Sequence, residues 1–220
     1  MVTIKEKDFV ELEYTGESEE GVFDTTDQAL AEKEDLPKYN AVYGPVTICI
    51  GEGHILKGLE KELVGKETGK DYEIKLEAEN AFGKKRTELF KLIPMSAFKK
   101  QNVKPMPGLQ VNIDNIVGTI KTVSGGRVYV DFNHYLAGKD VTYKVKINKV
   151  LTKTEDKVKA LLTLMMGNKS DYKLKDNKCT INLDVEVSKE MKDRAAKKLK
   201  DLTGVKEVKF NVKKTPKKDE

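Results

Sequence analysis

The segment Ile50-Gly51-Glu52-Gly53-His54-Ile55-Leu56-Lys57-Gly58-Leu59-Glu60 joins two kinds of predicted structure within one short span. The residues that lead into it, 46–50, have the β-branched, apolar character of a strand. Gly51 and Gly53 permit a sharp turn, and residues 55–63 then predict a short helix. The segment is therefore predicted to run from strand through turn to helix.

The glycines of this segment also invite comparison with nucleotide-binding loops, but their spacing does not fit. No Gly-Lys-Ser/Thr follows at the offset of a P-loop. A dinucleotide loop would need a third glycine where Leu56 stands. We therefore set nucleotide binding aside, and the sequence implies no cofactor.

On both sides of this segment the chain shows half-buried strands. Val10, Leu12 and Tyr14 share one face of a predicted strand, and Glu11 and Glu13 share the other. Similar runs are predicted at residues 22–24, 72–76 and 141–147. These strands and the short helix predict an α+β body built on an antiparallel sheet.

Charge divides the chain into three parts, although its net charge is only +5. Residues 1–83 with 132–152 are acidic, whereas residues 84–131 hold 9 Lys or Arg against 3 Asp or Glu. Residues 153–220 hold 19 against 12. We predict a body made from the first two ranges, a small β-rich domain inserted at 84–131, and a C-terminal domain at 153–220.

The C-terminal domain is predicted as helix, strand, helix and strand (αβαβ). Alternating apolar residues extend the first strand to Val187, Ser188 caps the second helix, and Gly204 closes it. Two strands leave open edges, so we predict that residues 153–220 form a homodimer. From about residue 213 the charged tail is predicted to be disordered.

The sequence predicts neither a disulfide, nor a metal site, nor a membrane-spanning segment. Cys49 and Cys179 are predicted to be buried thiols, and His54 and His134 have no ligand-spaced partners, so no metal site is predicted. No run approaches the roughly 18–20 apolar residues of a membrane span. We expect a soluble, cytoplasmic protein that does not bind membranes.

Four blocks of sequence occur in a fixed order: Val10-Glu11-Leu12-Glu13-Tyr14-Thr15-Gly16, Gly21-Val22-Phe23-Asp24-Thr25, residues 50–60, and Ala81-Phe82-Gly83. In order and spacing they resemble the signature of FKBP-type peptidyl-prolyl cis/trans isomerases. Residues 133–139 are similar to the segment that closes the insert-in-flap domain of the SlyD-like long type. The resemblance covers about residues 1–152.

The resemblance implies a twisted sheet wrapped over a short helix, with a proline pocket between them. It implies ten site residues: Asp24, Tyr14, Phe23, Leu56 and Phe82 as catalytic, and Val46, Ile55, Leu59, Leu136 and Tyr143 as substrate-binding. Asp24 would accept a hydrogen bond from Tyr14, and the Leu56 N–H would hold a substrate carbonyl. Aromatic walls would come from Tyr14, Phe23 and Tyr143.

The chain departs from the family at two positions. Leu59 stands where the family's pocket floor is usually Trp, and Phe82 replaces a usual Tyr. We expect weaker binding of the family's macrolide ligands, with isomerisation less affected. An alternative function for this chain is that of a non-catalytic holdase chaperone. The alternative interpretation of Phe23, Ile55, Leu59 and Tyr143 is that they are ordinary core residues.

The partners implied are unfolded or proline-containing polypeptides, which the inserted domain would bind as a chaperone. A ribosome or nucleic-acid adaptor is a third hypothesis, based on the basic C-terminal domain. The scarcity of arginines and of aromatics among the lysines disfavours it.

Overall fold

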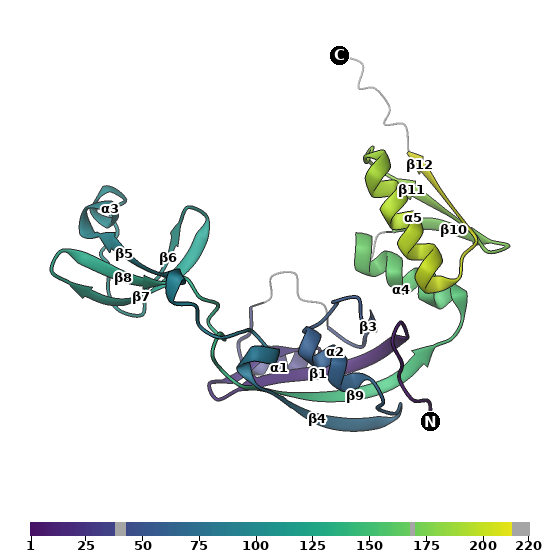
Figure 1. The fold of residues 1–220 in the computed structure, drawn as a ribbon, viewed down its shortest axis with the longest axis horizontal. Helices are drawn as coiled ribbons and strands as arrows, with labels where there is room; N and C mark the ends of the chain where they lie inside the picture. Colours follow the sequence, from purple (N-terminus) through teal and green to yellow (C-terminus); the bar gives the residue numbers. More distant parts are fainter. Residues whose placement is uncertain (38–42, 168–169, 213–220) are drawn as a thin grey trace, which may run out of the picture. The chain divides into compact units, whose positions relative to one another are not determined.

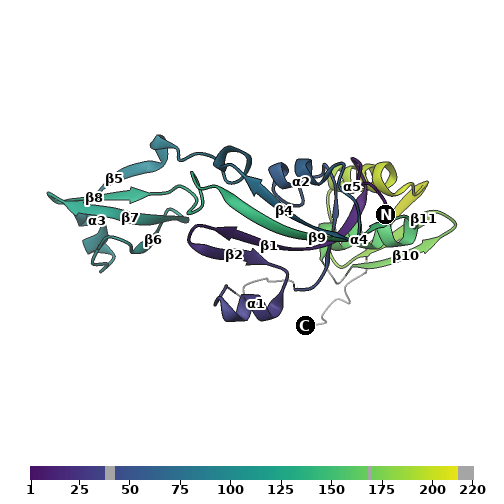
Figure 2. The ribbon, with the colours of Figure 1, turned by 90° about the horizontal axis from the view of Figure 1, so that it is seen from below.

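The computed structural model describes residues 1–37, 43–167 and 170–212. Contacts divide the chain into a first unit, residues 1–17, 22–74 and 143–220, and a second unit, residues 18–21 and 75–142. Each is described by itself, and Figures 1 and 2 give two views of the ribbon. The tail predicted to be disordered from about residue 213 lies outside the described residues.

A five-stranded sheet carries most of the predicted site. Its strands are β1 (Phe9–Ser18), β2 (Gly21–Thr25), β3 (Val46–Cys49), β4 (Lys70–Leu76) and β9 (Val141–Leu151). The order is β2-β1-β9-β4, and β3 pairs antiparallel with β1 so that Val46 lies opposite Leu12. Val10 and Leu12 are fully buried, as the period-two pattern predicts. Phe9 lies on the opposite face of β1, the face of Glu11 and Glu13, and is fully buried as well.

The short predicted helix is α2 (Lys57–Leu63), which lies above this sheet in Figure 1. Leu59 and Leu63 are its fully buried side chains. Helix α1 (Gln28–Lys33) begins after Asp27, whose carboxylate accepts from the Ala29 and Leu30 N–H groups. Figure 2 shows α1 beside the β2 end of the sheet.

The inserted segment folds as a separate small domain. The 3₁₀ turn η1 (Ala78–Asn80) precedes it in the chain. Its own elements are the 3₁₀ turn η2 (Thr87–Leu89), helix α3 (Met95–Lys100), and strands β5 (Phe90–Pro94), β6 (Gln110–Ile113), β7 (Ile116–Ser124) and β8 (Arg127–Asp131). The strands form an antiparallel sheet in the order β5-β8-β7-β6. Phe98, Ile120, Val128 and Val130 make its core.

The C-terminal domain has one strand more than the αβαβ prediction. Its elements are α4 (Thr154–Met166), β10 (Asp171–Lys175), β11 (Lys178–Leu183), α5 (Lys189–Thr203) and β12 (Glu207–Val212). β10 and β11 form an antiparallel hairpin, and β12 pairs parallel to β11. β11 ends at Leu183, so the predicted strand is shorter than expected and Val185 is 68% exposed.

The caps of α5 are as the sequence predicts. The Ser188 hydroxyl accepts from the Met191 N–H at 3.3 Å, and Gly204 adopts a left-handed conformation with φ 78°. The predicted α+β fold is confirmed: the isomerase body, the inserted domain and the C-terminal domain each have a sheet of their own.

The C-terminal domain shares its core with the five-stranded sheet. Phe9 of β1 and Cys49 of β3 are fully buried in one cluster with Leu161, Cys179 and Leu199 of the C-terminal domain. β1 and β3 therefore each contribute to two cores.

Within the described ranges, no helix is both long and apolar enough to cross a membrane.

Candidate active site

The centre of the site is a hydrogen bond between neighbouring strands. The Tyr14 hydroxyl of β1 donates to Asp24 Oδ2 of β2 at 3.1 Å. Burial raises the pKa of Asp24 above its usual value, although the bond from Tyr14 works against that rise. Burial, together with the charge of Asp24, raises the pKa of Tyr14 well above 10. The phenol therefore keeps its proton near neutral pH and acts as a donor.

Two further aromatic rings lie beside Tyr14, whereas Asp24 is exposed to solvent. Tyr143 of β9 has its ring centroid 5.9 Å from that of Tyr14 and 5.8 Å from that of Phe23, which it meets edge to face. Tyr143 is only 4% exposed. The three rings thus form an aromatic corner at the joint of β1, β2 and β9, and the exposed Asp24 carboxylate lies at its edge.

The turn at residues 51–54 is fastened to α2 by one carboxylate. Glu60, only 5% exposed, accepts from the N–H groups of Gly51 at 3.1 Å, Gly53 at 3.3 Å and His54 at 2.9 Å. Both glycines have positive φ, +89° and +72°, as the predicted sharp turn requires. The turn leads directly to Ile55 and Leu56.

Leu56 is the residue that precedes the first turn of α2. Within the described residues its N–H makes no hydrogen bond to the protein. Leu59, one helical turn later, is 1% exposed, and Val46 and Ile55 are partly buried. The structure places these four residues in the same unit as Tyr14 and Asp24.

Phe82 and Leu136 lie in the second unit. Phe82 stacks on His134 with the ring centroids 4.7 Å apart and the planes nearly parallel. The Gly138 N–H donates to the Gly83 carbonyl at 2.7 Å, and Leu136 is fully buried. The structure therefore places the Ala81-Phe82-Gly83 block in contact with the segment 133–139. The roles of Phe82 and Leu136 in the site stay a prediction.

Sequence reasoning missed two residues of the first unit. A Cβ on Gly16 would lie 2.7 Å from the Phe23 ring and 3.0 Å from that of Tyr143, so only glycine fits beside these rings. Its signal was a glycine inside a strand pattern, which marks close approach. Glu60 gave no signal of its own, because a carboxylate on a short helix is normally solvated.

A groove of about 940 Å³ opens along the charged sides of β1, β4 and β9, whose side chains include Glu13, Thr15, Glu73, Lys144 and Lys146. Period-two alternation turns these side chains away from Leu12 and Tyr143. Tyr14, Tyr43 and Tyr72 also border the groove, but Phe23, Asp24, Leu56 and Tyr143 do not, and we therefore do not place the predicted site in it. Among the described residues, no cluster of three His, Cys, Asp or Glu side chains could hold a metal ion.

Comparison with known proteins agrees with this geometry. Residues 2–100 match the family model of the FKBP-type peptidyl-prolyl cis-trans isomerase, and residues 91–136 match that of the FKBP26 IF domain. The chain is 28% identical over 147 residues to a short-type peptidyl-prolyl cis-trans isomerase of Methanocaldococcus jannaschii, covering 67% of this chain and 94% of that protein. It is 35% identical over 108 residues to a probable FKBP-type 16 kDa isomerase of Pseudomonas fluorescens, covering 47% and 71%.

A third relative is the SlyD isomerase of Vibrio cholerae, 32% identical over 124 residues, covering 54% of this chain and 61% of that protein. The matched family model and these relatives define an enzyme that isomerises the peptide bond before proline. The chain belongs to the FKBP-type peptidyl-prolyl cis-trans isomerases, with an insert-in-flap domain of the FKBP26 kind. The predicted family is confirmed.

Proposed function

We propose that the proline of a polypeptide substrate binds at the corner of Tyr14, Phe23 and Tyr143, with Asp24 facing the rotating amide. The observation that carries this proposal is the Tyr14–Asp24 hydrogen bond at the edge of the cluster of Tyr14, Phe23 and Tyr143 rings. Val46, Ile55 and Leu59 supply apolar surface, and the Leu56 N–H binds a substrate carbonyl.

This arrangement suits a reaction that needs no nucleophile. Amide resonance imposes a barrier of about 18–20 kcal/mol on rotation, and the twisted amide loses that resonance and its charge separation. An apolar site solvates the planar, polar amide less well than water does, so the twisted state is relatively favoured. The protein supplies shape and dryness, and Asp24 supplies a fixed charge beside the twisting bond.

The test is the rate of proline-limited refolding of a substrate protein. We expect Asp24→Ala to lower kcat/KM about tenfold, which corresponds to about 1.4 kcal/mol of lost transition-state stabilisation. Asp71→Ala, which removes an exposed carboxylate from β4, is the control. Equal activity of both variants would refute the assignment of the site.

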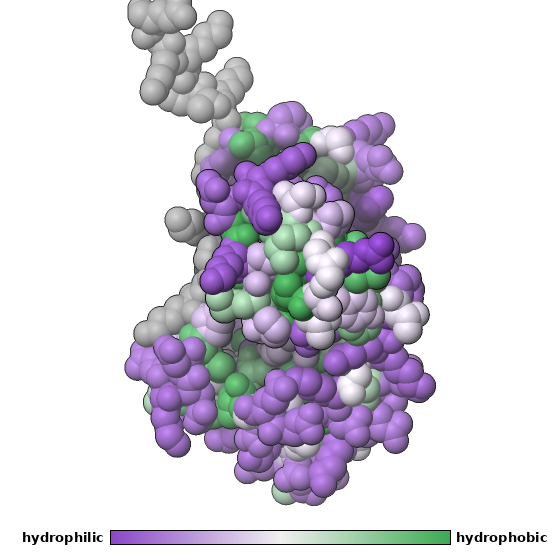
Figure 3. All heavy atoms as spheres, turned by 90° about the vertical axis from the view of Figure 1, so that its left-hand side faces the viewer, coloured by the Kyte–Doolittle hydropathy of each residue, from purple (hydrophilic) through white to green (hydrophobic). Residues whose placement is uncertain are grey.

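We also propose that the insert binds unfolded chains and acts as a chaperone. Of its apolar residues, Phe98 is buried and Ile93, Met95, Leu109 and Ile113 pack on the core, so these are structural. Leu92, Met106, Ile116, Val117 and Tyr129 are instead 37–61% exposed. Figure 3, which presents the insert to the viewer, shows hydrophobic side chains among pale and polar ones.

The insert surface is tested with the double substitution Leu92→Ser and Val117→Ser. Neither side chain belongs to the insert core, so the domain should still fold. We expect unchanged isomerisation of a tetrapeptide, with weaker suppression of aggregation and slower refolding of a protein substrate. Val2→Ser, equally apolar and 52% exposed, is the control. Aggregation suppression at the wild-type level would rule out this surface.

We further propose a homodimer through residues 153–220. Support comes from exposed apolar side chains of this domain, Leu164, Met165, Met166, Val185 and Met191, and from the outer position of β10 and β12 in its sheet. Light scattering of the full chain should give twice the monomer mass. Met191→Asp, which places a charge on the exposed apolar surface, should lower the measured mass toward that of the monomer. A monomer at micromolar concentration would contradict the proposal. The cytoplasmic location stays a prediction.

A further inference from the structure

The turn Gly51–His54 is held from two sides. Glu60 of α2 fastens it from within the isomerase domain through three backbone N–H groups. From the C-terminal domain, Lys198 of α5 places its Nζ 2.8 Å from Glu52 Oε2. The two side chains are only 33% and 27% exposed, so this pair is less solvated than the exposed Arg194–Glu190 pair on the same helix.

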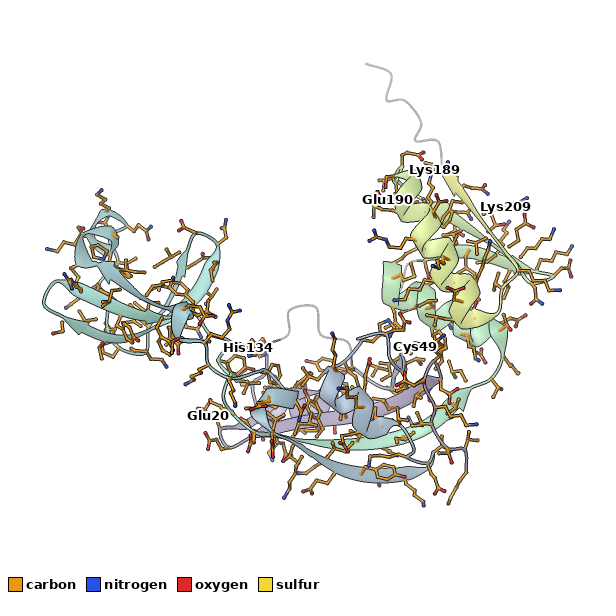
Figure 4. The ribbon with its side chains drawn as sticks, in the orientation of Figure 1. Glu20, Cys49, His134, Lys189, Glu190 and Lys209 are labelled. Atoms are coloured by element: carbon orange, nitrogen blue, oxygen red, sulfur yellow. The ribbon has the colours of Figure 1, made fainter. Side chains whose placement is uncertain are left out.

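The strand that leads into the turn is also covered by the C-terminal domain. Cys49, the last residue of β3, is fully buried in the cluster that contains Val158 of α4 and Leu199 of α5. Leu199 directly follows Lys198 in α5. The same turn of this helix therefore packs into the buried cluster that contains Cys49, through Leu199, and forms the ion pair with Glu52, through Lys198. Figure 4 shows Cys49 where the isomerase sheet approaches the C-terminal helices.

The turn is short, and its position sets that of the next residues. Gly51 and Gly53 have little intrinsic backbone stiffness, so the turn depends on its contacts for a fixed position. Ile55 and Leu56 follow without an intervening residue. A displacement of about 1 Å at a positioned donor is enough to slow catalysis markedly.

We propose that the C-terminal domain is a positioning element of the prolyl-isomerase site, through the contact of Lys198 with Glu52 in the turn that presents Leu56. This role rests on the proposed function of the Leu56 N–H. Lys198 and Glu52 are positioning residues and do not touch the substrate. Isomerisation is then coupled to a domain that lies outside the isomerase fold.

The test uses the full chain with Lys198→Met, Glu52→Gln, the double variant, and the charge exchange Glu52→Lys with Lys198→Glu. Methionine keeps the packing of the lysine stem but removes the charge. We expect each single variant to lower kcat/KM for a tetrapeptide about threefold, in line with a partly solvated ion pair. The double variant should lose no more than a single one, and the charge exchange should recover at least half of the loss.

Arg194→Met is the matched control, because it removes a cation from the same helix without touching the turn. Amide hydrogen exchange at Gly51, Gly53 and His54 reports on the turn independently of activity, and should accelerate in the single variants and recover in the charge exchange. Urea midpoints show whether any variant merely unfolds.

The proposal is overturned if kcat/KM or the exchange of these amides stays at the Arg194→Met level in both single variants. The proposal is also overturned if the double variant loses kcat/KM by the product of the two single-variant factors, because the two residues would then act independently. Asp24→Ala is measured in parallel. Unchanged activity of that variant would refute the proposed site itself, which the Lys198 and Glu52 variants do not test.

Discussion

Gly16 is the residue at which the aromatic corner is most easily disturbed. A Cβ at this position would lie 2.7 Å from Phe23 Cζ and 3.0 Å from Tyr143 Cε1. Its φ lies outside the left-handed region, so alanine causes no backbone strain there. The glycine is needed for space, not for conformation.

We therefore predict that Gly16→Ala pushes the Phe23 and Tyr143 rings out of place. The expected loss is about 1–3 kcal/mol of unfolding free energy, as for overpacked cores, together with a several-fold lower kcat/KM. Urea unfolding and a tetrapeptide assay measure the two effects. Adding Phe23→Leu should recover stability but not activity. Wild-type values of both in Gly16→Ala would show that the rings move freely.

His54 is the residue whose charge state most affects the turn. Its Nδ1 accepts from the Cys49 N–H at 3.1 Å, which requires the neutral ring. Burial lowers the pKa of His54 below 6.5, and Lys198 of α5 lowers it further, whereas Glu60 and Glu52 partly oppose the shift. Protonation therefore costs more in the folded chain than in the unfolded one.

The sign of the pH effect follows from this shift. Between the folded pKa of His54 and 6.5, the unfolded chain binds more protons, so the free energy of unfolding falls as pH drops through that window. Burial lowers the pKa of His134 as well, so wild-type unfolding alone does not isolate His54. We predict that His54→Asn, whose Oδ1 can still accept from Cys49, has a shallower decline between pH 7 and 5. Parallel curves for the two proteins would contradict this prediction.

At the scale of the element, two hairpin turns divide strands that the sequence alone did not separate or predict. The β10–β11 turn consists of Asp176 and Asn177, both with positive φ (49° and 58°), and the β6–β7 turn of Asp114 and Asn115 has the same form. Such two-residue turns match the twist of antiparallel strands. The Asp-Asn pair indicates a hairpin turn, and a hairpin needs a strand such as β10 before the turn. Residues 171–175 are too weakly apolar to predict that strand by themselves.

We predict that Asn177→Gly stabilises the β10–β11 hairpin by about 0.5–1 kcal/mol, because glycine prefers the left-handed conformation that Asn177 adopts. The carbonyl of residue 177, which accepts from the Lys206 N–H at 2.9 Å, is retained. Hydrogen exchange of the β11 amides measures the gain. Asn115→Gly should instead protect the insert strands β6 and β7. A gain in the wrong domain, or a loss in both, would contradict the turn assignment.

The order of elements in the isomerase domain could be predicted from sequence because its strands are half-buried, and alternation reports directly on that state. The Tyr14–Asp24 bond was also predicted, from the family resemblance. Glu60 was not predictable, since burial of a carboxylate depends on three backbone donors brought together by the turn. The end of β11 at Leu183 was mispredicted because Val185 and Val187 continue the alternation after strand pairing has stopped.

At the scale of the whole molecule, the isomerase sheet and the C-terminal domain of the first unit share one buried core. A half-buried strand predicts one covered face, which in β1 is the face of Val10 and Leu12, and Phe9 on the opposite face departs from that pattern because it is fully buried too. The pattern does not show which core covers a given residue. Phe9 and Cys49 are covered by C-terminal side chains such as Leu162 and Ile181, so the two domains bury apolar surface together.

This shared core leads to a prediction about cooperativity. Phe9→Ala in the full chain should cost about 3–5 kcal/mol, as for other large buried aromatics, and the loss should reach both domains. Leu12→Ala is the matched control, because Leu12 is just as buried on the same strand but lies outside the C-terminal cluster.

Native-state hydrogen exchange of β1 amides and of α4 and β11 amides separates the two cases. In Phe9→Ala, protection should fall in β1, α4 and β11 together. In Leu12→Ala it should fall in β1 while α4 and β11 keep more of theirs. If α4 and β11 were equally protected in Phe9→Ala and in the wild type, the two cores would be independent. The C-terminal domain would then be stable without Phe9, and its influence on the isomerase would be limited to the Lys198–Glu52 contact.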